Sequence, residues 1–281
     1  MPELPEIETF VRGLRPALKG RVILSAAVDW PRTVATFSVK DFQHRIAGRR
    51  VEALGRRGKY IILQLSGGDW LLIHPKMTGH LQVMPEDAPP GKHIRAVFYL
   101  DDGRQLWFRD PRKFGRLHLT SDPSTVVGDL GPEPLAEDFT AEAFAARLHR
   151  RRGRLKPLLL NQRFIAGLGN IYADEALFAA GLHPQRTADT LSDDEIVALY
   201  HAIQRILRQG IENRGTTLSD GSYRDTTGEA GSNQIHLCVY GRTDQPCVTC
   251  GTPVRRIVLN GRSAHFCPRC QRAGARGGDG L

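Results

Sequence analysis

The sequence has no apolar run close to the roughly 18 residues that a membrane-spanning helix needs. Its first residues, MPELPEIE, are acidic and lack the apolar stretch of a secretory signal. Hydrophobic residues make up 41% of the chain and charged residues 25%, which argues against a disordered or fibrous protein. We therefore expect a folded cytoplasmic protein that does not bind a membrane.

Lysine is scarce, because 32 of the 39 basic residues are arginine. The basic residues outnumber the 30 acidic ones and give a net charge of +9. A basic protein without a membrane segment favours a polyanionic partner, most often nucleic acid, and arginine binds phosphate with two hydrogen bonds. A GC-rich genome would equally explain the arginine bias, but it would not explain the net charge.

Cysteine is also rare, yet four of the five cysteines form two Cys-x-x-Cys pairs near the end of the chain. Sixteen residues separate Cys247 and Cys250 from Cys267 and Cys270, a spacing typical of zinc ribbons. We predict one structural Zn²⁺, because four thiolates fill its tetrahedral shell and leave no catalytic position. A redox dithiol is the alternative, but it needs only one pair. Cys238 lies in the apolar run IHLCVY and is expected in the core.

Apolar periodicity predicts a helix that follows Pro5 and ends near Gly20. Candidate strands then occur at 22–30, 59–65, 70–74, 94–100 and 104–109, a pattern typical of a β-sandwich. A segment rich in proline, glycine and acid at 121–137 marks a domain boundary. Beyond it we expect a helix at 171–180 and a longer one opened by a Ser192–Glu195 capping box.

The N-terminus carries a pair of residues that is suited to covalent chemistry. Because Pro2 is small, we expect Met1 to be removed, which would free a secondary amine. An α-amino group has a pKa of about 8 and can attack an aldehyde-like carbon to form an iminium. Glu3 could protonate a departing oxygen. Taken alone, a Pro-Glu pair is more often ordinary helix-start chemistry.

Two further segments favour binding to phosphate. The strip from Arg147 to Lys156 holds six cations and no acid, and more arginines follow within the ribbon. A solvated helix face is the alternative reading of that strip, but beside a zinc ribbon we favour contact with the DNA backbone. Gly167 and Gly169 allow a tight turn before Asn170, whose helix start could bind phosphate; a simple Asn N-cap is the alternative.

The whole chain resembles the formamidopyrimidine-DNA glycosylases, within the group that includes endonuclease VIII. The resemblance rests on motifs that occur in the same order: PELPEIET at 2–9, GRRGKY at 55–60, MTGHL at 77–81, DPRKFG at 110–115, LGPEPL at 130–135, IAGLGNIYADE at 165–175, GEAG at 228–231, VYGR at 239–242 and GRSAHFCPRCQ at 261–271. The combination of PELPE and DPRKFG favours the formamidopyrimidine branch.

The resemblance implies an α+β multidomain protein. Residues 1–130 would form the catalytic β-sandwich with its N-terminal helix, and 131–233 a helical helix–two-turn–helix domain that binds DNA. Residues 234–272 would form the zinc-ribbon finger, and 273–281 a flexible tail.

The resemblance also implies roles for residues in catalysis. Pro2 would be the nucleophile, and Glu3, Lys59 and Arg262 would act as proton donors. The activity implied is that of a bifunctional DNA glycosylase and abasic-site lyase, which excises 8-oxoguanine and formamidopyrimidines and then cuts the strand by β,δ-elimination. The partner would be double-stranded DNA that contains oxidised bases or abasic sites, bound by a nucleoid-associated monomer.

Other residues would contact the DNA. Met77, Arg112 and Phe114 resemble the group that fills the gap left by a flipped base, with Arg112 paired to the orphaned cytosine. The DNA contacts implied by the resemblance are Met77, His93, Arg112, Phe114, Asn170 and Arg262. Without the resemblance, Met77 and Phe114 would be assigned to the core.

The chain departs from the family pattern at three places. Pro75 precedes Lys76 and Met77 where the family usually has leucine, and proline removes an amide donor. Asn233 replaces an aromatic residue, and 216–227 corresponds to a variable loop over the extruded base. The alternatives are an endonuclease-VIII-like glycosylase for oxidised pyrimidines and a non-catalytic protein that binds abasic sites.

Overall fold

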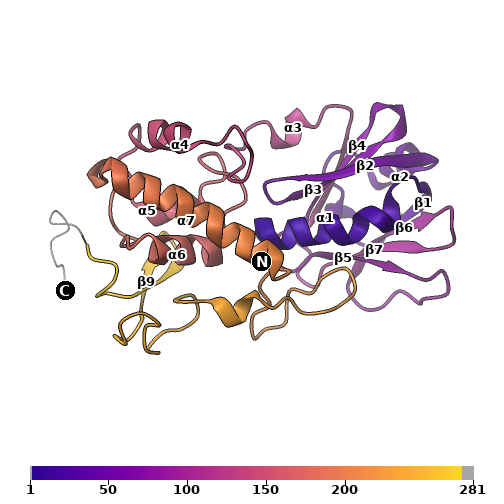
Figure 1. Ribbon diagram of the computed structural model, residues 1–281. Helices are drawn as coiled ribbons and strands as arrows, with labels where there is room; N and C mark the ends of the chain where they lie inside the picture. Colours follow the sequence, from indigo (N-terminus) through magenta and orange to yellow (C-terminus); the bar gives the residue numbers. More distant parts are fainter. Residues whose placement is uncertain (1, 274–281) are drawn as a thin grey trace. The chain divides into compact units, whose positions relative to one another are not determined.

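The computed structural model describes residues 2–273 (Figure 1). The prediction that Met1 is removed therefore lies outside the described residues, and so does the predicted flexible tail, 273–281, apart from residue 273. The chain forms two compact units. The first contains the residues up to Asp129 together with Gly210–Gln234, and the second contains Leu130–Gln209 and the residues from Ile235 onward. None of the helices within 2–273 is long and apolar enough to cross a membrane.

The first unit contains eight antiparallel strands, which pair in the order β5-β7-β6-β1-β2-β3-β4-β8. They are β1 (Val22–Val28), β2 (Arg49–Arg57), β3 (Tyr60–Leu65), β4 (Trp70–His74), β5 (His80–Met84), β6 (Ile94–Leu100), β7 (Gln105–Arg109) and β8 (Arg116–Thr120). Only two residue pairs join β1 to β2, Val22 with Arg50 and Ile23 with Arg49. The strands on the two sides of this β1–β2 junction are β5-β7-β6-β1 and β2-β3-β4-β8. Apolar residues from both groups of strands form one core, as in a β-sandwich.

Helix α1 (Leu4–Leu18) supplies the apolar stripe that packs into this core. Proline is tolerated in its first turn, where an amide would lack a helical partner. The helix ends before Gly20, which has φ +85° and so adopts a conformation that glycine enters without strain. The predicted helix and the β-sandwich are thus confirmed. Shorter elements are α2 (Val39–Ile46), α3 (Ser124–Val127), η1 (Pro31–Thr33) and η2 (Ser66–Gly68).

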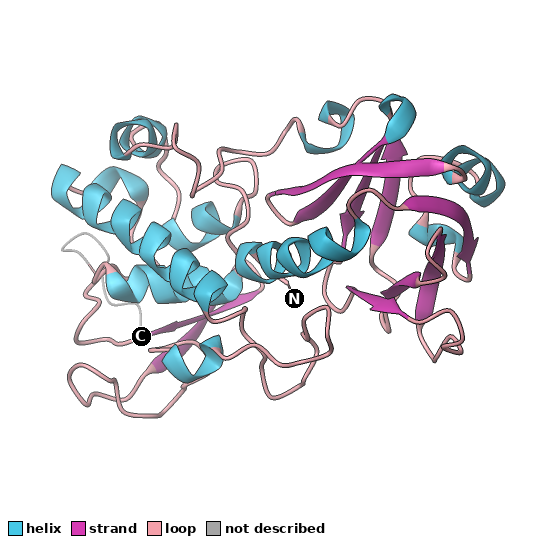
Figure 2. Ribbon diagram, turned by 45° about the vertical axis from the view of Figure 1, so that its right-hand side comes forward, coloured by secondary structure: helices cyan, strands magenta, loops and turns pink. Residues whose placement is uncertain are grey.

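The second unit combines helices with a two-stranded hairpin (Figure 2). Its elements are α4 (Ala141–Leu148), α5 (Leu155–Leu160), α6 (Asn170–Ala179), η3 (Ala188–Thr190), α7 (Asp193–Glu212), η4 (Asn233–His236), β9 (Arg255–Leu259) and β10 (Arg262–Phe266); α7 and η4 run across the division between the units. The predicted capping box is confirmed, since the Ser192 amide donates to Glu195 and the Glu195 amide donates to the Ser192 hydroxyl.

The prediction for Cys238 is wrong, because its thiol is half-buried and not in the core. The run IHLCVY forms the end of η4 and an irregular turn. The backbone amide of Cys238 donates to the buried Glu175 carboxylate at 2.8 Å, so this segment is held by polar contacts of its backbone.

Candidate functional site

The N-terminal residues are fixed at the start of α1. Pro2 and Glu3 are buried, and Glu3 is the N-cap residue of the helix. The Glu3 amide donates a 2.8 Å hydrogen bond to the carboxylate of Glu6, which is 1% exposed. The residue that follows Pro2 is thereby held in a defined conformation at the start of the helix.

Glu6 also connects α1 to a segment more than 200 residues away. Its other carboxylate oxygen accepts a 2.8 Å hydrogen bond from the Thr216 amide. Asn233, at the position of the usual aromatic residue, is buried and donates to the Thr216 hydroxyl at 2.9 Å. Asn213 in turn donates to Asn233 at 3.3 Å. The departure from the family pattern is therefore accommodated by polar contacts.

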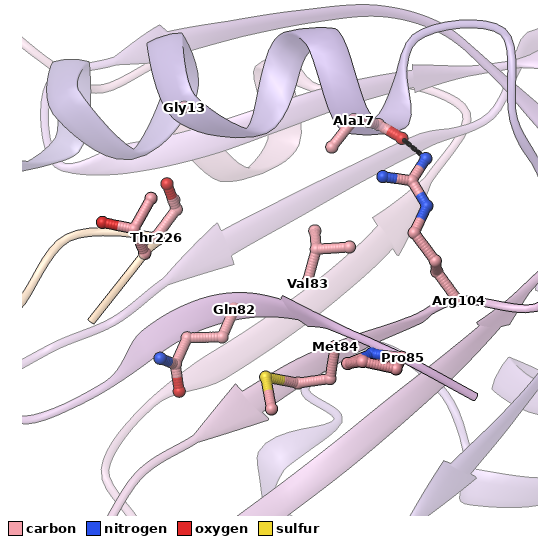
Figure 3. A pocket seen from close by; sticks show the side chains of 9 residues that line it. Gly13, Ala17, Gln82, Val83, Met84, Pro85, Arg104 and Thr226 are labelled. Carbon is pink, nitrogen blue, oxygen red and sulfur yellow. Dashed lines mark hydrogen bonds between the residues drawn. The ribbon is translucent and has the colours of Figure 1, made fainter. Parts of the chain in front are cut away.

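The segment 216–227 packs against α1. The Tyr223 ring meets the Phe10 ring edge-on at 5.6 Å, and burial raises the pKa of Tyr223. A Cβ atom at Gly13 would lie 2.2 Å from the Thr226 hydroxyl, so only glycine allows this approach. Beside Thr226 lies a cavity of about 510 Å³, which is lined by α1, strand β5 and the side chain of Arg104 (Figure 3). The Arg104 guanidinium donates a hydrogen bond to the Ala17 carbonyl of α1.

Lys59 lies in the turn between β2 and β3, which makes it a turn residue where the sequence predicted the start of a strand. The turn consists of Gly58 and Lys59, and Gly58 has φ +54°, as two-residue hairpins require. Lys59 is only 7% exposed. Arg56, at the end of β2, forms a 3.0 Å ion pair with Glu8 of α1. The hairpin with Lys59 is thus attached to α1, the helix that has Glu3 as its N-cap.

Met77 lies in a turn between β4 and β5 that forms despite Pro75. The Gly79 amide donates to the Pro75 carbonyl at 3.0 Å, and the Lys76 amide donates to the His74 ring at 2.9 Å. Burial and the neighbouring Lys76 charge lower the pKa of His74 to about 3, so its ring is neutral and can accept this bond. Proline at position 75 is therefore compatible with a closed turn before Met77.

Arg112 and Phe114 lie in the loop between β7 and β8. Phe114 is 47% exposed, and the Arg112 guanidinium lies 5.1 Å from the centre of its ring. Phe114 is therefore a surface residue, whereas its residue type alone would predict a place in the core. His93 is exposed and has φ +74°, an uncommon conformation for a residue with a side chain.

The second unit places Asn170 close to Arg262. Asn170 is the first residue of α6, with Gly169 as the N-cap, so it is not an ordinary Asn cap. Its amide nitrogen lies 3.2 Å from the hydroxyl of Ser263, the residue after Arg262. Arg262 is exposed and follows the Asn260–Gly261 turn of the β9–β10 hairpin.

Buried charges hold this hairpin on α6. Lys156 is 0% exposed, and its ammonium donates to Asp174 and to the Ser263 carbonyl, each at 2.5 Å. Asp174 also accepts from the His265 amide at 2.9 Å. The expectation that Lys156 belongs to an exposed basic strip is therefore wrong, because Lys156 pairs with an acid inside the unit. The exposed cations of that strip are Arg150, Arg151, Arg152 and Arg154.

The four cysteine sulfurs gather at one end of the hairpin, all within 4.8 Å of one another. The distances are 3.9 Å between the Cys247 and Cys270 sulfurs and 3.5 Å between those of Cys250 and Cys267. A tetrahedral zinc with Zn–S bonds of about 2.3 Å separates its sulfurs by about 3.8 Å, so this set fits the ion. One structural zinc bound by the four thiolates would close the ribbon.

Buried carboxylates support the site, and the sequence analysis did not identify them. Glu6 lies in PELPEIET, Asp110 in DPRKFG, and Asp174 and Glu175 in IAGLGNIYADE. Glu175 accepts from the amides of three residues at 2.8 to 3.0 Å, while burial raises its pKa. Their place within the motifs on which the family resemblance rests is the one signal that could have revealed them.

Known protein families match three successive parts of the chain. The formamidopyrimidine-DNA glycosylase N-terminal domain matches residues 1–117, and the H2TH domain of the same enzymes matches 130–222. A zinc finger found in FPG and IleRS matches 244–273.

Individual relatives match over almost the full length. The formamidopyrimidine-DNA glycosylase of Herpetosiphon aurantiacus is 48% identical over 274 residues, which cover 96% of this chain and 100% of the relative. The crystal structure of the MutM (FPG) protein from Thermus thermophilus has a TM-score of 0.88 and 42% identity, with 97% of this chain and 100% of that chain covered. A Lactococcus lactis FPG variant, in complex with DNA that contains Fapy-dG, has a TM-score of 0.90, 35% identity and the same coverage.

These matches agree with the β-sandwich, the helical part and the four-cysteine hairpin, in the order that the sequence predicts. The fold class and the structural zinc are thereby confirmed. The identity is high and the coverage is nearly complete in both directions. The chain belongs to the formamidopyrimidine-DNA glycosylase family.

Proposed function

We propose that this protein is a bifunctional DNA glycosylase and abasic-site lyase that excises 8-oxoguanine and formamidopyrimidines from duplex DNA. Family membership supports the activity, and a relative has been solved with Fapy-dG DNA. The observation that carries the proposal for this chain is the fixed N-terminus, where Glu3 follows Pro2 and the Glu6 carboxylate holds the Glu3 amide. That arrangement suits an amine nucleophile with an acid beside it.

In the proposed reaction, the unprotonated Pro2 amine attacks C1′ of the damaged nucleotide. A C–N bond forms as the bond from C1′ to the base breaks, and the base leaves with a proton. Glu3 protonates the deoxyribose ring oxygen, which opens the sugar and leaves an iminium. Lys59 and Arg262 supply protons during the β- and δ-eliminations, which release the two flanking phosphates. Zinc supplies only the fold of the ribbon.

The other residues bind the DNA in this proposal. Met77 and Phe114 fill the gap left by the flipped nucleotide, Arg112 pairs with the opposite base, and His93 contacts the strand. Asn170 and Arg262 bind phosphates. We also infer that the protein acts as a monomer on nucleoid DNA, because one chain supplies every residue that the reaction needs.

A panel of lesion duplexes tests the proposal. Excision of 8-oxoguanine and formamidopyrimidine should exceed excision of oxidised pyrimidines in single-turnover assays, and undamaged duplex should stay intact. A preference for oxidised pyrimidines would instead support the endonuclease-VIII-like alternative. Binding of abasic DNA without any cleavage would identify a non-catalytic protein.

The base opposite the lesion should also affect the rate. Arg112 can donate two hydrogen bonds to the O2 and N3 atoms of cytosine, whereas adenine offers no matching pair of acceptors. A good bidentate contact is worth about 1–3 kcal/mol of discrimination, roughly 5- to 150-fold. Arg112→Ala should therefore lower excision opposite cytosine and flatten the cytosine-to-adenine ratio. If the variant slowed all four opposing bases equally, Arg112 would contact only the backbone.

A further inference from the structure

We propose that Asp110 is the positioning residue that fixes the two gap-filling loops, the Met77 turn and the Arg112–Phe114 loop, relative to each other. The proposal rests on the proposed function, since it assumes that those side chains enter the DNA. Asp110 is 1% exposed, so it acts through its neighbours and does not contact the DNA itself. Its carboxylate and backbone form hydrogen bonds with residues that are, or directly follow, the four predicted DNA contacts of the first unit. These contacts are Met77, His93, Arg112 and Phe114.

One oxygen of the Asp110 carboxylate joins the two loops. It accepts a 2.6 Å hydrogen bond from the hydroxyl of Thr78, the residue after Met77. The same oxygen accepts from the Arg112 amide at 3.2 Å, and that amide also lies 3.3 Å from the Thr78 hydroxyl. A single carboxylate oxygen thus sets the spacing between the backbones of Met77 and Arg112.

The second oxygen fixes the far end of the Arg112–Phe114 loop. It accepts a 2.7 Å hydrogen bond from the amide of Gly115, the residue after Phe114. A Cβ atom at Gly115 would lie 2.3 Å from the Phe108 ring and 3.2 Å from this oxygen, so the approach depends on glycine. The loop is therefore closed at both ends by one buried anion, while the side chains of Arg112 and Phe114 project to the surface.

The backbone of Asp110 extends the arrangement to His93. The Asp110 amide donates to the His93 carbonyl at 2.8 Å. Arg95, which is 7% exposed, donates to the Asp110 carbonyl at 2.9 Å and lies 3.2 Å from the His93 ring nitrogen. The exposed ring of His93 is thereby tied to the same centre as the two loops.

Hydrogen bonds from amides and a hydroxyl to a buried carboxylate are stronger than neutral ones, and they cannot be exchanged for water without exposing the charge. The two loops should therefore present Met77, Arg112 and Phe114 in one preorganised geometry before DNA binds. Removing the Thr78 bond should leave each loop folded but free to shift against the other. Discrimination of the opposite base should then fall more than catalysis at Pro2.

The test compares Thr78→Val, which keeps the shape but removes the hydroxyl, with Thr78→Ser, which keeps the hydroxyl. The readout is the single-turnover excision rate opposite cytosine divided by the rate opposite adenine. Arg112→Ala is the reference for a variant in which this ratio has been flattened. Thr78→Val should reduce the ratio at least about fivefold, and Thr78→Ser should retain it. Asp110→Asn, which has one acceptor oxygen fewer, should reduce the ratio further.

One control, and two results that would each overturn a different claim, complete the test. Borohydride trapping on a single strand with a preformed abasic site needs no gap filling, so Thr78→Val should trap within about twofold of the wild type. A cytosine-to-adenine ratio in Thr78→Val equal to that of the wild type would overturn the role of Asp110. A wild type that fails to excise, or whose ratio does not depend on Arg112, would instead overturn the proposed function.

Discussion

The two units hold their predicted DNA contacts by different means. In the first unit, the buried carboxylate of Asp110 accepts hydrogen bonds from the Thr78 hydroxyl, next to Met77, and from the amides of Arg112 and Gly115. In the second, Arg262 lies on a hairpin held by the four-cysteine cluster and by the buried Lys156–Asp174 pair. The first arrangement is complete within the polypeptide, whereas the second depends on a metal and on an ion pair. The two units should therefore fail under different treatments.

Removal of the metal should produce the largest difference in response between the two units. Structural zinc contributes about 10 kcal/mol or more of apparent binding free energy to a small metal-dependent fold. Cys250→Ser should therefore lose the metal, unfold the ribbon and abolish DNA binding through Arg262. The β-sandwich should keep its circular dichroism signal, because its core contains none of the cysteines. Zinc content, circular dichroism and DNA affinity measure the three effects. Normal DNA binding and cleavage by metal-free protein would contradict this account of the second unit.

Breaking the buried ion pair should have the next largest effect. Lys156→Met leaves the Asp174 carboxylate without its cation, a change that typically costs about 3–5 kcal/mol. The free energy of unfolding should fall by that amount in a denaturant titration. The double variant Lys156→Met/Asp174→Asn removes both charges and should recover part of the loss. Equal stability of the single variant and the wild type would mean that the pair does not hold the hairpin.

Loss of surface charge should have the smallest effect and should appear only in DNA binding. The logarithm of the affinity should fall linearly with the logarithm of the salt concentration, with a slope of about 0.9 per neutralised phosphate. Arg151→Ala/Arg152→Ala should reduce that slope by about 1.8 if both side chains contact phosphates. The control Arg32→Ala/Lys40→Ala changes two exposed cations outside the predicted contacts and should keep the slope. An affinity that did not depend on salt would indicate a different partner.

The fold was predictable where local pattern decides it. Helix α1 follows from its apolar spacing between Pro5 and Gly20, and the ribbon follows from the cysteine spacing. Strand β2 was missed because RRVEALGRR has few apolar residues, and a bulge between Val51 and Ala53 interrupts their alternation. The family resemblance, and not periodicity, supplied the helix–two-turn–helix and the roles of the site residues.

The supports of the site could not be predicted, because they join residues that are distant in the sequence. Glu6 meets Thr216 across 210 positions, and Lys156 meets Ser263 across 107. In the sequence, the buried Lys156 cannot be distinguished from the exposed cations of the basic strip, because its partner Asp174 lies on another helix. The domain boundaries and the role of each site residue remain predictions.

The central claim is that the free amine of Pro2 is the nucleophile, and borohydride trapping on an 8-oxoguanine·cytosine duplex tests it most directly. The mature protein, with its N-terminus verified by mass spectrometry, should form a covalent adduct with the lesion strand. A chain that retains Met1 should form none, because the Pro2 nitrogen is then a tertiary amide that cannot attack. Efficient trapping by the chain that retains Met1 would contradict the account.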